Sequence, residues 1–157
     1  MQSRLNSTIA AVIACAVAAA GRSAVRAAPP VQEPETTRTV WDGVFTEQQS
    51  KRGQAIYSDT CAKCHSETLG GGESATALVG DTFEAGWNGL TVGDLFERTR
   101  ISMPQDKPSS LSRQQVADVL AYIFEANNFP RGEKELDRNL QVLKSIRLVM
   151  PKPAKSQ

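Results

Sequence analysis

The spacing of hydrophobic positions changes along the chain, and each spacing predicts a different kind of segment. Residues 9–20 are apolar without interruption and rich in alanine. From about residue 46 onward, apolar residues recur at intervals of three and four, which is the period of an amphipathic helix. No stretch shows the strict alternation of a half-buried strand. The pattern predicts an all-α domain of about four helices, preceded by an apolar N-terminal segment.

The first predicted helix starts after Thr46 and stops near Asp59. Thr46 and Gln49 have the spacing of a capping box, in which two side chains satisfy free N–H groups of the first turn. Gly53 lies inside this helix, where glycine costs about 1 kcal/mol relative to alanine. This cost suggests that another helix approaches closely at Gly53.

Three further helical segments follow a glycine-rich loop over residues 66–80. One starts at Thr91 and ends before Pro104, because the residue before a proline avoids the helical conformation. The strongest starts after Ser112, which forms a second capping box with Gln115. Its apolar positions share one face: Val116, Val119, Leu120, Ile123 and Phe124. The last segment has four apolar positions at helical spacing: Leu136, Leu140, Leu143 and Ile146.

The N-terminal apolar run has the features of a secretory signal. It follows Arg4, is too short to span a membrane, and is followed by small residues up to Ala27. Cleavage after Ala27 removes three arginines and no acidic residue, so the formal net charge falls from +1 to −2. We therefore expect export to the periplasm. The alternatives are a buried N-terminal helix and a lipoprotein that is lipidated at Cys15.

The chain of 157 residues is long enough for one folded domain. We expect a signal peptide over residues 1–27, a Pro- and Thr-rich tether over 28–40, the domain over 41–148 and a tail over 149–157. The chain has no apolar run of membrane-spanning length and no basic block that would indicate nucleic-acid binding. We expect membrane association only if Cys15 is lipidated or the signal is not cleaved.

The candidate chemistry lies in residues 61–65, Cys-Ala-Lys-Cys-His, because C-x-x-C-H is the attachment signature of c-type haem. Two cysteines on one helical turn, Cys61 and Cys64, can each form a thioether with one vinyl group of the same porphyrin. His65 then directs its imidazole at the iron. A zinc site needs four ligands where this motif offers three, and a thioredoxin-like site needs a βαβ context. The motif therefore predicts one covalently attached haem c, with Lys63 as a solvated spacer.

Met103 is the candidate for the second axial ligand of the iron. His65 is the only histidine, so ligation by two histidines is excluded. Met1 is removed with the signal, which leaves Met103 and Met150. Met103 precedes Pro104 in a loop between two predicted helices, whereas Met150 lies in a tail that is less able to hold a weak ligand. We favour Met103, and the alternatives are Met150 and an open coordination site.

Together these features resemble the monohaem class I cytochromes c. The resemblance covers residues 41–148 and is carried by residues 61–65, by Met103 with the proline after it, and by the flanking helices. It implies a cytochrome c fold in which the helices surround one covalently bound haem. The Trp-Asn-Gly-Leu sequence at residues 87–90 is also similar to bacterial members associated with quinoprotein dehydrogenases.

Two details of the resemblance concern packing and the haem ligand. In the family the first and last core helices cross, which implies that Gly53 and Tyr57 lie against Leu120 and Tyr122. Family members often have a proline after the haem histidine, and the carbonyl of this proline accepts a hydrogen bond from the imidazole. Residues 75–80 contain no proline, so we expect another backbone carbonyl to take this role.

The implied function is single-electron transfer by a protein that is not itself an enzyme. With His65 and Met103 both on the iron, no coordination position is left for a substrate. The redox partners would be a dehydrogenase or a quinol-oxidising complex, and an oxidase or another cytochrome. The alternatives are a haem subunit of a larger dehydrogenase complex, and an open-site peroxidase or gas sensor if Met103 does not bind iron. Three side chains are candidates for contacts with the haem or its propionates: Trp87, Arg98 and Arg100.

Overall fold

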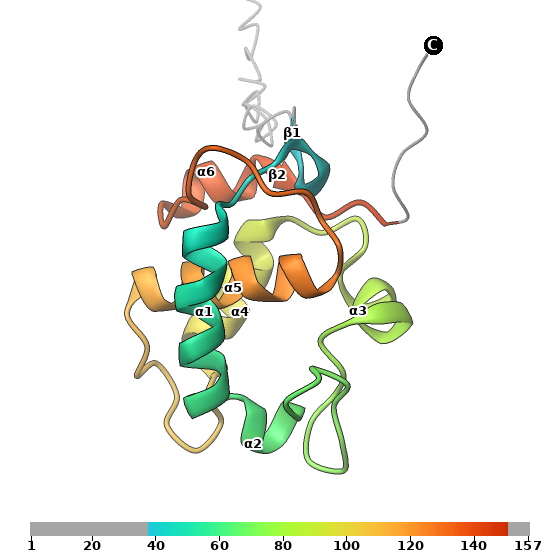
Figure 1. The fold of residues 1–157 in the computed structure, drawn as a ribbon, viewed down its shortest axis with the longest axis vertical. Helices are drawn as coiled ribbons and strands as arrows, with labels where there is room; N and C mark the ends of the chain where they lie inside the picture. The colour runs from blue at the N-terminus through green and yellow to red at the C-terminus, as the bar shows by residue number, and fades with distance from the viewer. Residues whose placement is uncertain (1–37, 151–157) are drawn as a thin grey trace, which may run out of the picture. The chain divides into compact units, whose positions relative to one another are not determined.

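Two helices that cross at a glycine form the centre of the fold. In the computed structural model, which describes residues 38–150, α1 (Glu47–Thr60) crosses α5 (Arg113–Ala126) as Figure 1 shows. A Cβ atom on Gly53 would lie 1.8 Å from the carbonyl oxygen of Asp118 and 3.1 Å from Cβ of Tyr122. The ring centroids of Tyr57 and Tyr122 are 5.3 Å apart. The predicted close approach at Gly53 is confirmed, and Asp118, not Leu120, supplies the nearest atoms.

The two predicted capping boxes have different outcomes. At Ser112, Oγ accepts from the backbone N–H of Gln115 at 3.2 Å, and Oε1 of Gln115 accepts from the N–H of Ser112 at 2.9 Å. Thr46 Oγ1 also accepts from Gln49 N, but the Gln49 amide bonds instead to both backbone groups of Leu136, at 3.0 and 2.6 Å. The predicted cap by Thr46 is therefore confirmed. The predicted hydrogen bond from Gln49 back to the cap is wrong, because the buried Gln49 amide bonds to the backbone of Leu136.

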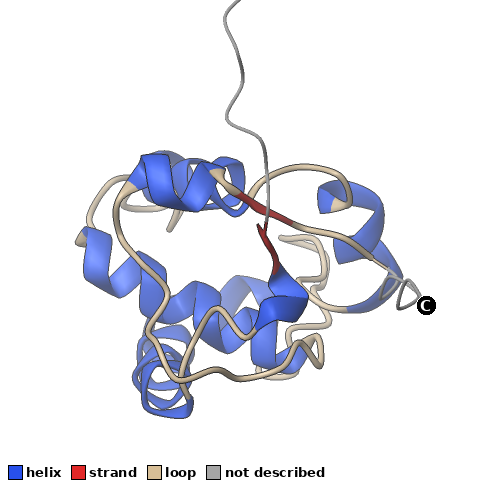
Figure 2. Ribbon diagram, turned by 90° about the horizontal axis from the view of Figure 1, so that it is seen from above, coloured by secondary structure: helices blue, strands red, loops and turns tan. Residues whose placement is uncertain are grey.

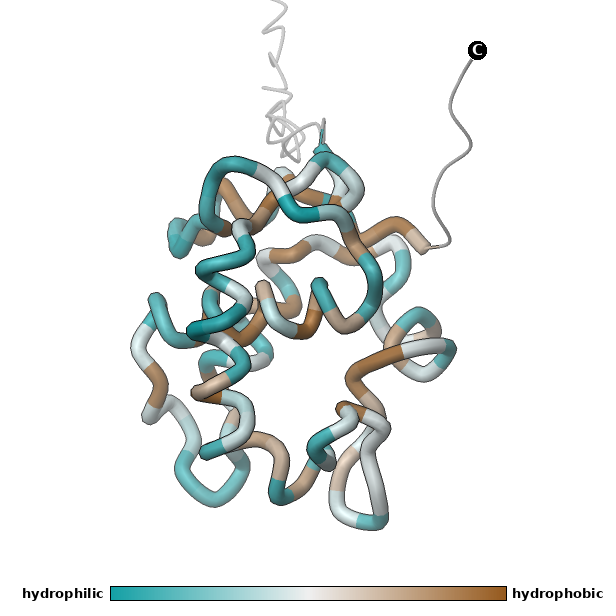
Figure 3. Tube along the Cα trace, in the orientation of Figure 1, coloured by the Kyte–Doolittle hydropathy of each residue, from teal (hydrophilic) through white to brown (hydrophobic). Residues whose placement is uncertain are grey.

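The two helices bury very different faces. All five apolar positions predicted for the inner face of α5 are buried. Helix α1 is mostly hydrophilic in Figure 3 and buries a small, largely polar set: Gln49, Ser50, Gly53 and Tyr57. Burial of the α5 stripe therefore drives this packing, and the small residues of α1 allow the close contact.

Four shorter α-helices complete the described part, in place of the two further helices that were expected. They are α2 (Ala62–His65), α3 (Gly80–Trp87), α4 (Val92–Ser102) and α6 (Leu140–Lys144). Helix α4 starts as predicted at a Thr91 cap, whereas α3 was not predicted and buries only Phe83. The last predicted helix is cut short, because Leu136 precedes the Asn139 cap of α6 and Ile146 lies in a strand. Helical structure still dominates the described residues, in agreement with the all-α prediction.

Residues near both ends of the described range belong to the folded part. Strand β1 (Arg38–Thr39) pairs in parallel with β2 (Ile146–Arg147), as Figure 2 shows, and the short 3₁₀ helix η1 (Val40–Asp42) follows β1. Val40 was expected in the tether and is fully buried. Residues 149 and 150 were expected in the tail, but their backbones bond to Trp41 Nε1 at 2.7 Å and to Asn88 Oδ1 at 2.9 Å.

The predicted signal peptide, Cys15, most of the tether and the rest of the tail lie outside the residues that the structure describes. Within residues 38–150, no helix is long and apolar enough to cross a membrane.

We expect Gly53→Ala to lower the free energy of unfolding by about 3 kcal/mol, the upper end for overpacking, because a methyl group would push against the α5 backbone. Urea unfolding of the haem-loaded protein, followed by circular dichroism, measures the change. Gly86→Ala is the matched control, because a Cβ on this helical glycine of α3 meets nothing within 4 Å. The crossing would not depend on glycine if both variants were as stable as the wild type.

Candidate functional site

The two cysteines and the histidine of residues 61–65 are held by a single helical turn. Cys61 caps the end of α1 and the start of α2, and its carbonyl oxygen accepts from the backbone N–H groups of Cys64 at 3.1 Å and His65 at 3.0 Å. The three side chains are half-buried and line one cavity of about 280 Å³. The structure therefore brings the three motif residues together on one wall.

Met103, which follows α4, also lines the cavity. Its walls include apolar residues of the loop before α3, of α4, of α5 and of the segment after α4: Leu78, Leu95, Val119, Ile123 and Pro104. Met150 instead has only 8% of its surface exposed and packs in the hydrophobic core. Of the two candidate methionines, the structure places only Met103 in the cavity with His65.

The His65 ring is oriented by a backbone carbonyl. Its Nδ1 lies 2.8 Å from the carbonyl oxygen of Thr76. A carbonyl can only accept a hydrogen bond, so Nδ1 donates its proton and Nε2 of the neutral ring keeps a lone pair for a metal. Thr76 lies in the proline-free segment where another carbonyl was expected to take this role.

The loop that carries Thr76 is shaped by glycine and by backbone bonds. Gly71 donates to the carbonyl of His65 at 3.0 Å and has a φ of +72°, where a Cβ would meet Ala77 N at 2.5 Å. The Tyr57 hydroxyl donates to the carbonyl of Ser66 at 2.7 Å and fixes the start of the loop. The predicted loop thus needs a glycine at position 71, and it has a defined path back to the histidine.

Asn127 fastens the far end of this loop to α5, and the sequence did not reveal that role. Its Nδ2 donates to the carbonyls of Leu78 at 2.9 Å and Ile123 at 2.8 Å, while Oδ1 accepts from Gly80 N at 3.2 Å. The only sequence signal was an asparagine at the predicted end of a helix, where this residue type is common. Its partners 47 and 49 residues away could not be read from that pattern.

Met103 stands directly after the last turn of α4. Its backbone N–H donates to the carbonyl of Thr99 at 3.0 Å, which ends the helix. Lys63, expected to be a solvated spacer, forms an ion pair with Asp106 in the loop that follows Met103. This hydrogen-bonded pair lowers the pKa of Asp106 and raises that of Lys63. Lys63 is therefore exposed, as expected of a solvated spacer, but it also has an ion-pair partner.

The three candidates for contacts with a haem or its propionates lie in different places. Trp87 and Arg98 line the cavity. Arg100 does not line it and forms a two-pronged ion pair with Glu97, at 2.9 and 3.0 Å. Of the two arginines, only Arg98 is therefore positioned at the cavity.

The donor set and the apolar walls fit a haem better than a zinc ion. Burial, with a smaller contribution from Cys64, raises the pKa of the Cys61 thiol to about 11. Zinc binds the thiolate, so zinc binding would first have to displace the proton of this thiol, whereas a thioether bond to haem needs no thiolate ligand. Among residues 38–150 there is no group of three or more His, Cys, Asp and Glu side chains that could hold a metal ion. Two thiols on one turn, a free imidazole Nε2 and a thioether around an apolar cavity are the groups that a c-type haem uses.

Comparisons with known proteins agree with this chemistry. Residues 48–123 match the family model described as cytochrome C oxidase, cbb3-type, subunit III, a range that contains the motif and Met103. No curated protein matches the chain. The chain is similar to one solved structure, the sulfane dehydrogenase SoxCD from Paracoccus pantotrophus, with 18% identity and a TM-score of 0.46. The alignment covers 82% of this chain and 68% of that one.

We expect Asn127→Ala to lower the free energy of unfolding by about 1–2 kcal/mol, because Leu78 O and Gly80 N lose a partner. Exchange of the His65 Nδ1 proton with solvent should also become faster, since the Thr76 loop is held less firmly. Proton NMR measures the exchange, and thermal or urea unfolding measures the stability. Asn128→Gly is the control, because Asn128 is exposed and has a φ of +61° that glycine adopts freely. Equal exchange in the two variants would contradict the role of Asn127.

Proposed function

Because the chain is a c-type cytochrome, we propose that it carries one haem c bound covalently through Cys61 and Cys64 and that it transfers single electrons. The observation that carries this proposal is the shared cavity: both cysteines, the imidazole of His65 and the thioether of Met103 line it together. Bound there, a haem supplies an iron that gains or loses one electron. The residues of the chain would supply the attachment, the ligands and the surroundings of that iron.

His65 and Met103 are the proposed axial ligands of the iron. The Thr76 carbonyl holds the His65 ring with Nε2 free, which also makes the imidazole a better electron donor. A thioether is a soft, weak ligand, and pairing it with an imidazole raises the reduction potential. Two protein side chains in these positions would leave the iron no place for a substrate, which suits a site that only exchanges electrons.

The cavity walls support electron transfer in a second way. Leu95, Val119 and Ile123 are buried apolar side chains that would keep water away from a haem bound in the cavity. A dry site resists the gain of charge on the iron, so this burial also favours the reduced, less charged form.

We place the protein in the periplasm and give it redox protein partners. The support for export is the signal pattern in residues 1–27, and the support for partners is the function itself. A dehydrogenase or quinol-oxidising complex would supply electrons, and an oxidase or another cytochrome would accept them.

A second candidate is a haem subunit of a larger complex. The family model that matches residues 48–123 is described as a subunit of an oxidase. This description favours a subunit over a free carrier. The electron-transfer chemistry is the same in both cases, and they differ only in attachment. Native gel separation of haem-stained extracts distinguishes a free protein from a bound subunit.

The absorption spectrum of the ferric protein tests the ligand set. We expect a six-coordinate low-spin spectrum with a sulfur-to-iron charge-transfer band, and we expect Met103→Leu to abolish that band. Met150→Leu is the matched control, because Met150 packs in the core and the exchange keeps its volume. A five-coordinate high-spin wild type would instead favour the open-site alternative, a peroxidase or gas sensor.

The covalent attachment has its own test. Replacing both Cys61 and Cys64 by serine should leave no haem on the polypeptide after denaturation, as measured by the pyridine haemochrome assay. Haem retained by that double variant would overturn the attachment through these two residues.

A further inference from the structure

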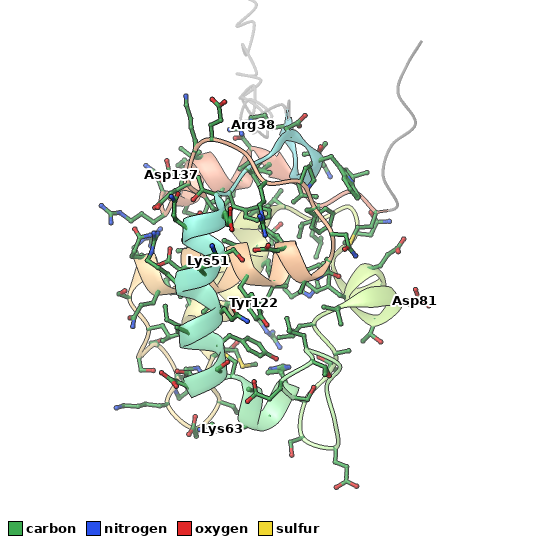
Figure 4. All side chains as sticks on the ribbon, in the orientation of Figure 1. Arg38, Lys51, Lys63, Asp81, Tyr122 and Asp137 are labelled. Atoms are coloured by element: carbon green, nitrogen blue, oxygen red, sulfur yellow. The ribbon has the colours of Figure 1, made fainter. Side chains whose placement is uncertain are left out.

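One ion pair joins the two segments that carry the proposed axial ligands. Lys63 lies between the two cysteines in α2, and Asp106 lies three residues after Met103. Figure 4 labels Lys63 at the α2 end of the domain, beside the loop that connects α4 to α5. Lys63 and Asp106 both line the cavity, so the pair stands at its edge and not on a remote surface.

The loop that follows Met103 has few other contacts. Residues 105–110 are all exposed. Its remaining hydrogen bonds are local: Lys107 N donates to the carbonyl of Pro104 at 3.0 Å, and Ser109 Oγ lies 3.4 Å from the carbonyl of Ile101. Within residues 38–150, the Lys63–Asp106 pair is the one polar contact that crosses from this loop to the helical turn of the cysteines.

We propose that Lys63 and Asp106 are positioning residues that hold the Met103 loop over the cavity. The pair reduces the freedom of the loop when Met103 is away from the iron, so less entropy is lost when Met103 binds. Met103 then competes better against small ligands that could take its place. This inference rests on the proposed function, because it requires Met103 to be a ligand.

The pair has a modest strength, which sets the size of the expected effect. The side chains of Lys63 and Asp106 keep 52% and 59% of their surface exposed, so water and salt screen their attraction. Exposed pairs of this kind change an equilibrium by about two- to fivefold. An effect of that size is measurable in a binding titration and leaves the fold intact.

Imidazole titration of the ferric protein tests the proposal, because imidazole displaces a methionine ligand and the displacement is visible in the spectrum. We expect Lys63→Gln and Asp106→Asn each to raise the affinity for imidazole about two- to fivefold at low ionic strength. The double variant should bind imidazole no more tightly than either single variant. The differences should disappear near 1 M salt, where the screening length is about 3 Å.

Lys107→Gln is the matched control, because Lys107 is exposed on the same loop and its side chain has no ion pair with the described residues. It removes the same charge but keeps the Lys63–Asp106 ion pair, so it should change the affinity much less than Lys63→Gln. Exchanging the charges, with Lys63→Glu and Asp106→Lys together, should restore the affinity of the wild type.

Three outcomes would overturn the proposal, and they can be told apart. A wild-type protein that shows methionine ligation, with equal imidazole affinity in the Lys63→Gln and Lys107→Gln variants, overturns the role of the pair alone. A wild-type spectrum without methionine ligation overturns both this role and the proposed ligand set. Additive effects of the two single substitutions would also overturn it, because they would show that the two residues act independently.

Discussion

The structure depends on one contact between two backbones, where α1 crosses α5. At Gly53 the carbonyl oxygen of Asp118 comes so close that a Cβ would stand 1.8 Å from it. The same two helices help to line the cavity, because α1 runs directly into Cys61 while α5 contributes Val119 and Ile123. Any change in the crossing therefore moves Cys61 and Cys64 relative to the α5 side chains that line the same cavity.

Polar side chains extend this crossing to the C-terminal segment. Asp118 is buried, with 3% of its surface exposed, and its carboxylate accepts two hydrogen bonds from Arg52 at 3.1 and 3.0 Å. Such a charge is tolerated because it is paired. Arg52 also bonds to Glu135, and Gln49 one turn earlier bonds to Leu136. Polar side chains of α1 thus hold the segment before α6 through hydrogen bonds and an ion pair, which a purely apolar helix face could not form.

Most of the local features that the sequence predicts are those in which both partners lie close together in the chain. The close approach at Gly53 is the exception, because a glycine inside a helix marks it although its partner lies on α5. The Ser112 and Gln115 box forms because the two residues share one turn, and the spacing of residues 61–65 indicates its chemistry for the same reason. Gln49 has an equivalent spacing from its cap, but its amide bonds to Leu136, 87 residues away. Asn127 and the two-residue strands β1 and β2 are likewise defined by distant partners. Nothing in their local pattern could reveal this.

The two proposed axial ligands are held by very different amounts of structure. His65 belongs to a helical turn, and its ring is bonded to Thr76 in a loop that is itself bonded to α5. Beyond Met103 the chain is exposed and returns to the cysteine turn through the Lys63–Asp106 ion pair. Ordering such a loop costs entropy, and a thioether is a weak ligand, so the Met103 side is the less stable of the two. The motif residues serve an electron carrier and an open-site haem protein equally well. The physical difference between these two functions therefore lies in how firmly the Met103 loop is held, which the motif does not encode.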